Sequence, residues 1–155
     1  MFFSLSRFFS KRSLFNGIHF RDLSKENYEF HNVLNECYGY INGKHVCTFE
    51  NLNISGTNLH IDHFALHSPF IGKNYGEQCL RAFAKMLSVQ REDIKTIDFS
   101  LYKTTGNIKN NLERLEKVRD ARKHLLEKIG ARNIKVEHPS ELCYDVTGIW
   151  EKSMW

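Results

Sequence analysis

The amino-acid sequence predicts an α/β protein of the α+β type, with a mixed, mostly antiparallel central sheet of about six to seven strands flanked by helices. Short runs rich in Tyr, Val, Ile and Phe, separated by turn residues, indicate strands in the first half of the chain. Two segments with apolar residues at helical spacing indicate helices, and these alternate with strands in the second half. The 155 residues, 41% of them hydrophobic and 26% charged, are typical of a globular protein.

The first half of the chain is expected to form strands at 28–35, 36–41, 44–49 and 59–66. The dipeptide Asn42-Gly43 predicts a type I′ turn, because both residues tolerate positive φ and strand-forming runs flank them. A second turn, from Ser55 to Asn58, leads into the run 59–66. That run alternates and then becomes apolar, which is typical of a central strand.

The second half is expected to form a helix from about Gly76, a strand over 94–102, a long helix over 107–129 and two strands over 133–137 and 143–150. The first helix carries its apolar residues at helical spacing, at Cys79, Leu80, Phe83, Ala84 and Leu87. The long helix is expected to end at Gly130. Its predicted apolar face consists of Ile108, Leu112, Leu115, Val118, Leu125 and Ile129.

Residues 1–27 form a basic segment rich in Phe and Ser, and residues 28–155 are expected to form a single domain. The first segment is interpreted as a structural element that docks its Phe side chains, with a mitochondrial presequence as the alternative. Otherwise a cytoplasmic location is expected. The four cysteines contain no CxxC pair and are expected to be free buried thiols. No apolar run approaches the roughly 20 residues that cross a bilayer.

The net charge of +4 is unevenly distributed along the chain. Basic residues are concentrated in the first segment and in 103–132, and the remainder is acidic. This pattern argues against a uniformly basic protein that coats nucleic acid, so a nucleic-acid partner is not favoured. The charges of the long helix alternate at spacings of three and four residues, which fits either a solvated face or a face that attracts an anionic ligand.

The loop between the central strand and the first helix has the composition of an anion site. It contains Gly72, Lys73, Asn74, Tyr75 and Gly76. Two glycines permit close backbone approach, Asn tolerates the left-handed region, and a helix N-terminus favours negative charge. The loop matches neither a Walker A motif nor a GxGxxG fingerprint, so a pyrophosphate site and a flexible loop both remain open from the residues alone.

The stretch LHIDHFALHSPFIGKNYGEQCLRAFAKML resembles the core of the GNAT acetyltransferase superfamily, and HLLEKIGARN resembles the tail of its last helix. The resemblance implies a GNAT-like fold that binds acetyl-CoA as co-substrate. It places the pantetheine arm and thioester against Phe64, Ala65 and Leu66, with the Leu66 N–H as the oxyanion donor. It places the pyrophosphate in the loop from Gly72 to Gly76, and Ile71 stands where the family carries Gln or Arg.

Acetyl transfer to an amine needs a base for the ammonium proton and an acid for the departing thiolate. His60 is the candidate base, and strand alternation places Asp62 on the same face, where it could orient the imidazole. The alternative is a half-buried strand histidine with an ordinary hydrogen bond. The resemblance implies a tyrosine acid at a position that holds Leu126, so Tyr102 is the candidate acid and His124 the alternative.

Other chemistry-bearing residues are interpreted as structural, namely His63, His67 and Cys79. Because His60 and His63 project from opposite faces of a strand, no metal site is expected.

The sequence therefore predicts an N-acyltransferase that moves an acetyl group directly from acetyl-CoA to an amine on a small molecule or protein. A GNAT-like module that binds CoA, or only a protein partner, without catalysis is the alternative, and a GNAT toxin or other RNA-directed protein is the third interpretation. A homodimer is left open.

Overall fold

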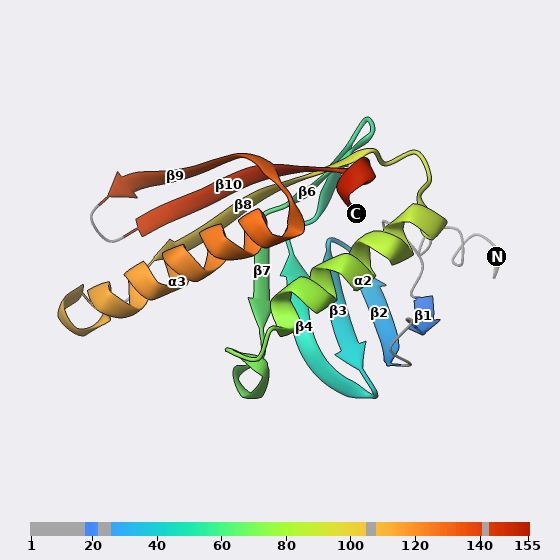
Figure 1. Ribbon diagram of the computed structural model, residues 1–155, viewed down its shortest axis with the longest axis horizontal. Coiled ribbons are helices and arrows are strands. Elements are labelled where there is room, and N and C mark those ends of the chain that lie inside the picture. Colours follow the sequence, from blue (N-terminus) through green and yellow to red (C-terminus); the bar gives the residue numbers. More distant parts are fainter. Residues whose placement is uncertain (1–17, 22–25, 105–107, 141–142) are drawn as a thin grey trace, which may run out of the picture.

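The computed structural model describes residues 18–21, 26–104, 108–140 and 143–155. Within these ranges the chain forms ten strands and two α-helices, arranged as two five-stranded sheets. Figure 1 shows both helices in front of the sheets. The predicted α+β class, with a mixed sheet flanked by helices, is confirmed, although the strands are more numerous than expected and are divided between two sheets.

The first sheet is wholly antiparallel and has the strand order β1-β2-β3-β4-β7. Asn42 and Gly43 join two of its strands with φ values of 50° and 80°, which confirms the expected turn. Its strands are β1 (Ile18–Arg21), β2 (Asn27–Val33), β3 (Glu36–Ile41), β4 (Lys44–Glu50) and β7 (His63–Leu66).

The second sheet has the strand order β5-β6-β8-β10-β9, and β6 is parallel to β8 while the other neighbours are antiparallel. Pro139 was expected between strands but lies in β9, an edge strand where a missing N–H is tolerated. The strands are β5 (Asn53–Ser55), β6 (Asn58–Ile61), β8 (Thr96–Thr104), β9 (Arg132–Ser140) and β10 (Cys143–Glu151).

The expected single strand over 59–66 is wrong, because the chain divides it at Asp62 into β6 and β7. The pairing partner changes at this residue. β6 pairs with β8 of the second sheet up to Ile61, whereas β7 pairs with β4 of the first sheet from His63 onward. Figure 1 shows β7 and β8 diverging beyond the division. The two sheets therefore diverge beyond Asp62, with β7 at the edge of one sheet and β8 in the other.

The first helix, α2 (Tyr75–Gln90), buries the apolar stripe that its sequence predicts, together with Ala82 and Met86. The second helix, α3 (Ile108–Ile129), buries Leu115, Leu126 and Ile129. Its expected face is correct only in part, because Leu112 is 42% exposed and Leu126 takes a place in the core. The Leu126 side chain packs beside Gly148 of β10, where an added Cβ would lie 3.1 Å from it.

The second sheet has one apolar face and one polar face. Cross-strand neighbours such as Leu59, Ile97 and Trp150 are buried, and the Trp150 indole N–H donates to the carbonyl of Ile129 in α3 at 2.9 Å. Alternation along the strands therefore directs His60 and Asp98 to the face away from α3. The helix-covered face carries the core, and the other face carries polar groups.

All four cysteines are free and buried, as expected. Within the described ranges, neither helix is long and apolar enough to cross a membrane. Ile18–Arg21 pairs with β2 as an edge strand. The remaining residues of the basic first segment, except Glu26 and Asn27, lie outside the described residues, and so do both of its interpretations, the expected docking of Phe side chains and the alternative presequence.

Candidate functional site

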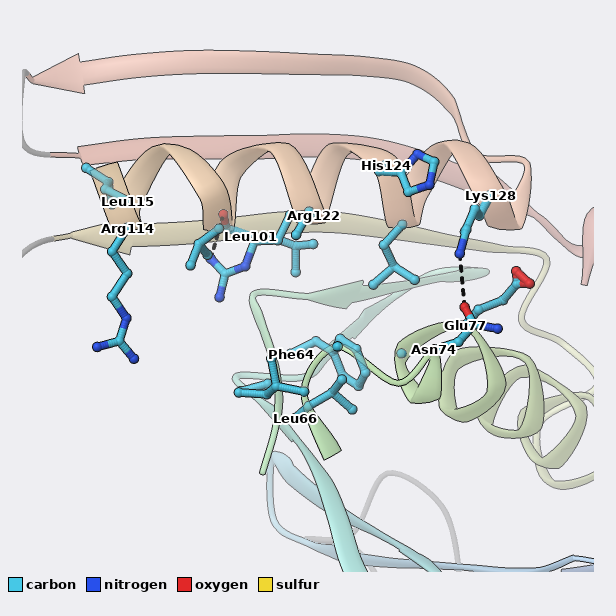
Figure 2. A pocket seen from close by; sticks show the side chains of 17 residues that line it. Phe64, Leu66, Asn74, Glu77, Leu101, Arg114, Leu115, Arg122, His124 and Lys128 are labelled. Atoms are coloured by element: carbon cyan, nitrogen blue, oxygen red, sulfur yellow. Dashed lines mark hydrogen bonds between the residues drawn. The ribbon is translucent and has the colours of Figure 1, made fainter. Parts of the chain in front are cut away.

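A cavity of about 620 Å³ lies where the two sheets diverge. Its walls come from β7, the loop before α2, the first turn of α2, β8 and one face of α3 (Figure 2). It is lined by Phe64, Ala65, Leu66, Ile71, Gly72, Asn74, Gly76, Glu77, Leu101, Arg114, Leu115, Val118, Ala121, Arg122, His124, Leu125 and Lys128.

Most residues expected to hold a cofactor line this cavity. They are Phe64, Ala65, Leu66, Ile71, Gly72, Asn74 and Gly76. Lys73 and Tyr75 are not among the lining residues, and the Tyr75 ring packs at right angles to Phe70 with centroids 5.2 Å apart. Gly72 and Asn74 have φ values of 80° and 63°, so the loop turns twice through the left-handed region. The glycine and asparagine of the loop thus occupy the conformations that these residue types tolerate.

Gly76 allows α2 and α3 to approach each other closely beside the cavity. A Cβ at this position would lie 3.4 Å from both methyl groups of Leu125 and 3.8 Å from Leu66. An alanine would make ordinary contacts there, whereas a larger side chain would enter the space that the cavity occupies. The first turn of α2 therefore depends on a small residue to keep this space open.

The charge of the cavity comes mainly from α3, whose charged face was expected either to be solvated or to attract an anionic ligand, and which carries the alternative acid His124. Arg114, Arg122, His124 and Lys128 line the cavity, against one carboxylate at Glu77. The Lys128 ammonium donates to the Asn74 side-chain oxygen at 3.0 Å and so links α3 to the loop (Figure 2). Lys73 of the predicted loop is not among the lining residues, so the basic side chains of the cavity wall come from α3.

The signal for this cationic wall was present in the helix sequence. Positions 114, 118, 121, 125 and 128 are separated by alternating steps of four and three, so they form one stripe of the helix. The stripe mixes apolar residues with basic ones. Acidic and basic residues alternate on the rest of the helix, so this stripe does not stand out in the sequence.

Arg122 occupies an unusual position in the cavity wall. Its Nη1 donates to the backbone carbonyls of Leu101 at 3.3 Å and Tyr102 at 3.1 Å. Both carbonyls belong to the part of β8 that lies beyond its pairing with β6. Burial lowers the pKa of the Arg122 guanidinium, and the nearby Tyr144 and Asp145 oppose this change. The side chain still carries its charge, because an arginine is not deprotonated in proteins.

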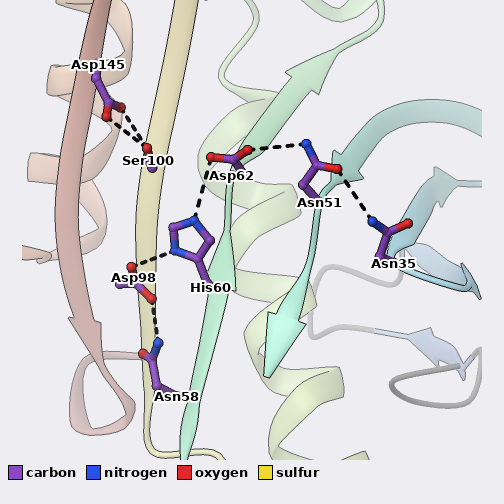
Figure 3. Close-up of polar contacts among 8 residues, drawn as sticks. All are labelled: Asn35, Asn51, Asn58, His60, Asp62, Asp98, Ser100 and Asp145. Carbon is purple, nitrogen blue, oxygen red and sulfur yellow. Dashed lines mark hydrogen bonds and ion pairs between the residues drawn. The ribbon is translucent and has the colours of Figure 1, made fainter. Parts of the chain in front are cut away.

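His60 lies outside the cavity lining, in a polar network on the other face of the second sheet (Figure 3). Its Nδ1 is 2.7 Å from Asp98 Oδ2, and its Nε2 is 3.7 Å from Asp62 Oδ1. The imidazole thus lies between two carboxylates. Asp98, which the sequence did not indicate, makes the shorter contact, and Asp62, which was expected to orient the imidazole, makes the longer one.

The network extends along both strands that hold it. Asn58 donates to the other oxygen of Asp98 at 2.5 Å and accepts from the Thr96 hydroxyl at 2.8 Å. Asp62 accepts from the Asn51 amide at 3.2 Å. Because β6 and β8 are parallel in register, His60 is the direct neighbour of Asp98. This pairing joins residues 38 positions apart, which no local pattern indicates.

The two candidate acids lie on different sides of the sheet. Tyr102 is 46% exposed and outside the cavity lining, and a hydrogen bond with Cys143 raises the pKa of its phenol. His124 lines the cavity. Leu126, where the resemblance implied a tyrosine, is fully buried and does not line it.

The remaining histidines and Cys79 do not contribute to the cavity lining. The His67 ring lies 3.8 Å from the His45 ring, and burial together with His67 lowers the pKa of His45. Cys79 belongs to the core. In the part of the chain that the structure describes, no group of three or more His, Cys, Asp or Glu could hold a metal ion.

No protein-family model matches the sequence, and no curated protein matches it. Solved structures match it by fold. The ribosomal-protein-S18-alanine N-acetyltransferase from Escherichia coli matches 75% of this chain over 67% of its own length, with 12% identity and a TM-score of 0.50. A GNAT-family acetyltransferase from Bacillus anthracis matches 77% of this chain over 67% of its own length, with 13% identity and a TM-score of 0.50. The chain has the GNAT fold.

Proposed function

We propose that the protein is an acetyl-CoA-dependent N-acyltransferase that transfers the acetyl group directly to an amine. The observation that carries this proposal is the cavity between the diverging sheets. Most of the residues that the sequence predicted for the pantetheine arm and pyrophosphate line it, together with four basic or histidine side chains of α3. An anionic ligand with a long apolar arm fits such a lining, which combines basic side chains along α3 with apolar residues of β7.

The basic helix supports a small anionic ligand more than a nucleic acid. Arg114, Arg122 and Lys128 turn toward the cavity, and Lys117 and Lys123 pair with glutamates one turn away on the same helix. The positive charges of α3 are thus divided between the cavity and local ion pairs. A basic stripe that tracks a phosphate backbone would instead be open along its length.

In the proposed reaction His60 accepts the proton of the attacking amine, directly or through water. Asp98 accepts the Nδ1 proton and so leaves Nε2, on the Asp62 side, as the basic nitrogen. Asp62 lies where the strand divides, at the opening between the sheets. We propose that the amine approaches this opening from the face opposite to α3.

A CoA-binding module without catalysis is the second candidate. The observation that favours it is that neither His60 nor Tyr102 lines the cavity, and that Leu126, where the resemblance implies a tyrosine acid, is fully buried. The two candidates share the ligand and differ in turnover.

The test combines acetyl-CoA binding with release of free CoA. Ligand at about 100 times its dissociation constant stabilises a fold by about 2.7 kcal/mol, so acetyl-CoA is expected to raise the melting temperature clearly. A panel of polyamines, peptide amino termini and charged tRNA is expected to contain an acceptor that releases CoA. His60→Gln is expected to keep the thermal shift and to lose turnover by about 100-fold or more. His31→Gln, an exposed histidine of β2, is the matched control.

Each outcome separates the candidates. No thermal shift at millimolar acetyl-CoA would contradict both of them. A shift without CoA release from any acceptor would favour the binding module. Equal turnover in His60→Gln and wild type would reject His60 as the base.

A further inference from the structure

Arg122 is placed where a transferase of this kind must accommodate new negative charge. It lines the cavity, and its Nη1 is held by two carbonyls on β8 opposite β7. Figure 2 shows the side chain pointing from α3 toward the space above Phe64 and Leu66. The guanidinium thus forms the β8 side of the opening between the sheets.

Among the described arginines, Arg81 and Arg122 donate to backbone carbonyls, and of these two Arg122 lines the cavity. Arg91, Arg119 and Arg132 each pair with a carboxylate, at 3.0, 2.9 and 2.7 Å. Within the described ranges, Arg122 forms no ion pair, and its hydrogen bonds end on neutral carbonyls. Because Arg122 is half-buried and its hydrogen-bond partners are neutral carbonyls, its charge favours an anion that enters the cavity.

Arg122 is also separated from the loop that would hold phosphates. Lys128, which bonds to Asn74 of that loop, is six residues further along α3, or about 9 Å along the helix axis. Arg122 therefore belongs to the β7 and β8 end of the cavity, where the thioester would lie. Leu126, one turn further along α3, packs into the core, whereas Arg122 lines the cavity.

We propose that Arg122 stabilises the thiolate of the departing CoA. This inference rests on the proposed function. The amine nitrogen attacks the thioester carbonyl carbon, a C–N bond forms, the C–S bond breaks and its electron pair stays on sulfur, while His60 takes the amine proton. Arg122 keeps its protons and pairs with the thiolate, which takes a proton from solvent after release. A fixed cation at the leaving group replaces an acid that would have to donate a proton.

The experiment measures how pH changes the affinity for CoA relative to desulfo-CoA, which has the same phosphates and no thiol. A thiol ionises near pH 8.5, and a cation that lowers its pKa by one unit in the complex raises affinity about tenfold at high pH. Isothermal titration between pH 6.5 and 9.5 is expected to show the CoA to desulfo-CoA affinity ratio rising about tenfold in wild type. In Arg122→Gln the ratio is expected to stay flat.

Two further variants make the result interpretable. Arg122→Lys keeps a charge and is expected to retain part of the rise, and it is available if Arg122→Gln does not fold. Lys123→Gln, an exposed neighbour, is expected to behave as wild type. A flat ratio in wild type, or the same rise in folded Arg122→Gln, would overturn the role of Arg122 alone. Failure of wild type to bind either ligand would overturn the proposed function and this inference together.

Discussion

The two faces of the second sheet carry different chemistry on the same strands. On the face covered by α3, Leu59, Ile97 and Trp150 are fully buried, and Leu101 of the same face lines the cavity. On the opposite face, the neighbouring positions His60 and Asp98 form a hydrogen-bonded pair that is about one third exposed. Stability and the proposed cofactor site thus share one face, while the proposed base lies on the other.

Strand alternation and register together produce this difference. Because β6 and β8 are parallel, Leu59 lies beside Ile97 and His60 lies beside Asp98. A shift of one residue would exchange the apolar and polar faces of one strand. Substitutions on the face covered by α3 are therefore expected to change the free energy of unfolding, and substitutions on the opposite face are expected to change turnover.

The largest effect is expected on the helix-covered face. Trp150→Ala removes a fully buried indole and its hydrogen bond to Ile129, and such changes cost about 3–5 kcal/mol of unfolding free energy. Ser100→Ala on the open face removes only a hydroxyl that donates to Asp145, at about 1 kcal/mol. Urea unfolding of both variants measures the two costs. Equal costs would contradict the assignment of the core to one face.

A smaller effect, on turnover alone, is expected for Asp98→Asn. The change weakens the acceptor for the His60 Nδ1 proton, so kcat is expected to fall about tenfold while the KM for acetyl-CoA stays constant. Asp93→Asn breaks an exposed pair with Arg91 away from the site and serves as the control. A change in acetyl-CoA KM with unchanged kcat would place Asp98 in cofactor binding instead.

The smallest effect is expected for Lys128→Gln at the loop end of the cavity. Loss of the charge and of the bond to Asn74 is expected to weaken acetyl-CoA binding by about three- to fivefold, with a weaker salt dependence. Lys117→Gln removes an equal charge that is paired with Glu113 on solvent-exposed helix surface. If both variants weaken binding equally, the helix acts through its overall charge and not through the cavity.

Local sequence patterns predict the elements and one wall of the site. The Asn42-Gly43 turn, the apolar stripe of α2 and the loop up to Gly76 depend on neighbouring residues, and the structure contains all three. The division at Asp62 depends on which strands pair with each other. Residues 59–66 have an uninterrupted strand pattern, so no local pattern indicates the division.

Sequence patterns missed two site residues for the same reason, because long-range packing places both of them. Asp98 comes beside His60 only through strand pairing, and Arg122 enters the cavity only because α3 packs over the diverging strands. The domain boundary at residue 28 and the cytoplasmic location stay predictions, and a homodimer stays open.

The central claim is that the cavity between the sheets binds acetyl-CoA. Isothermal titration of wild type, Gly76→Ala and Gly76→Phe tests it directly, because a Cβ at this position meets Leu125 at ordinary contact distance while a larger side chain fills the cavity. One molecule of acetyl-CoA is expected to bind to wild type and to Gly76→Ala, and none to folded Gly76→Phe. Absence of binding to wild type, or equal binding by folded Gly76→Phe, would contradict the claim.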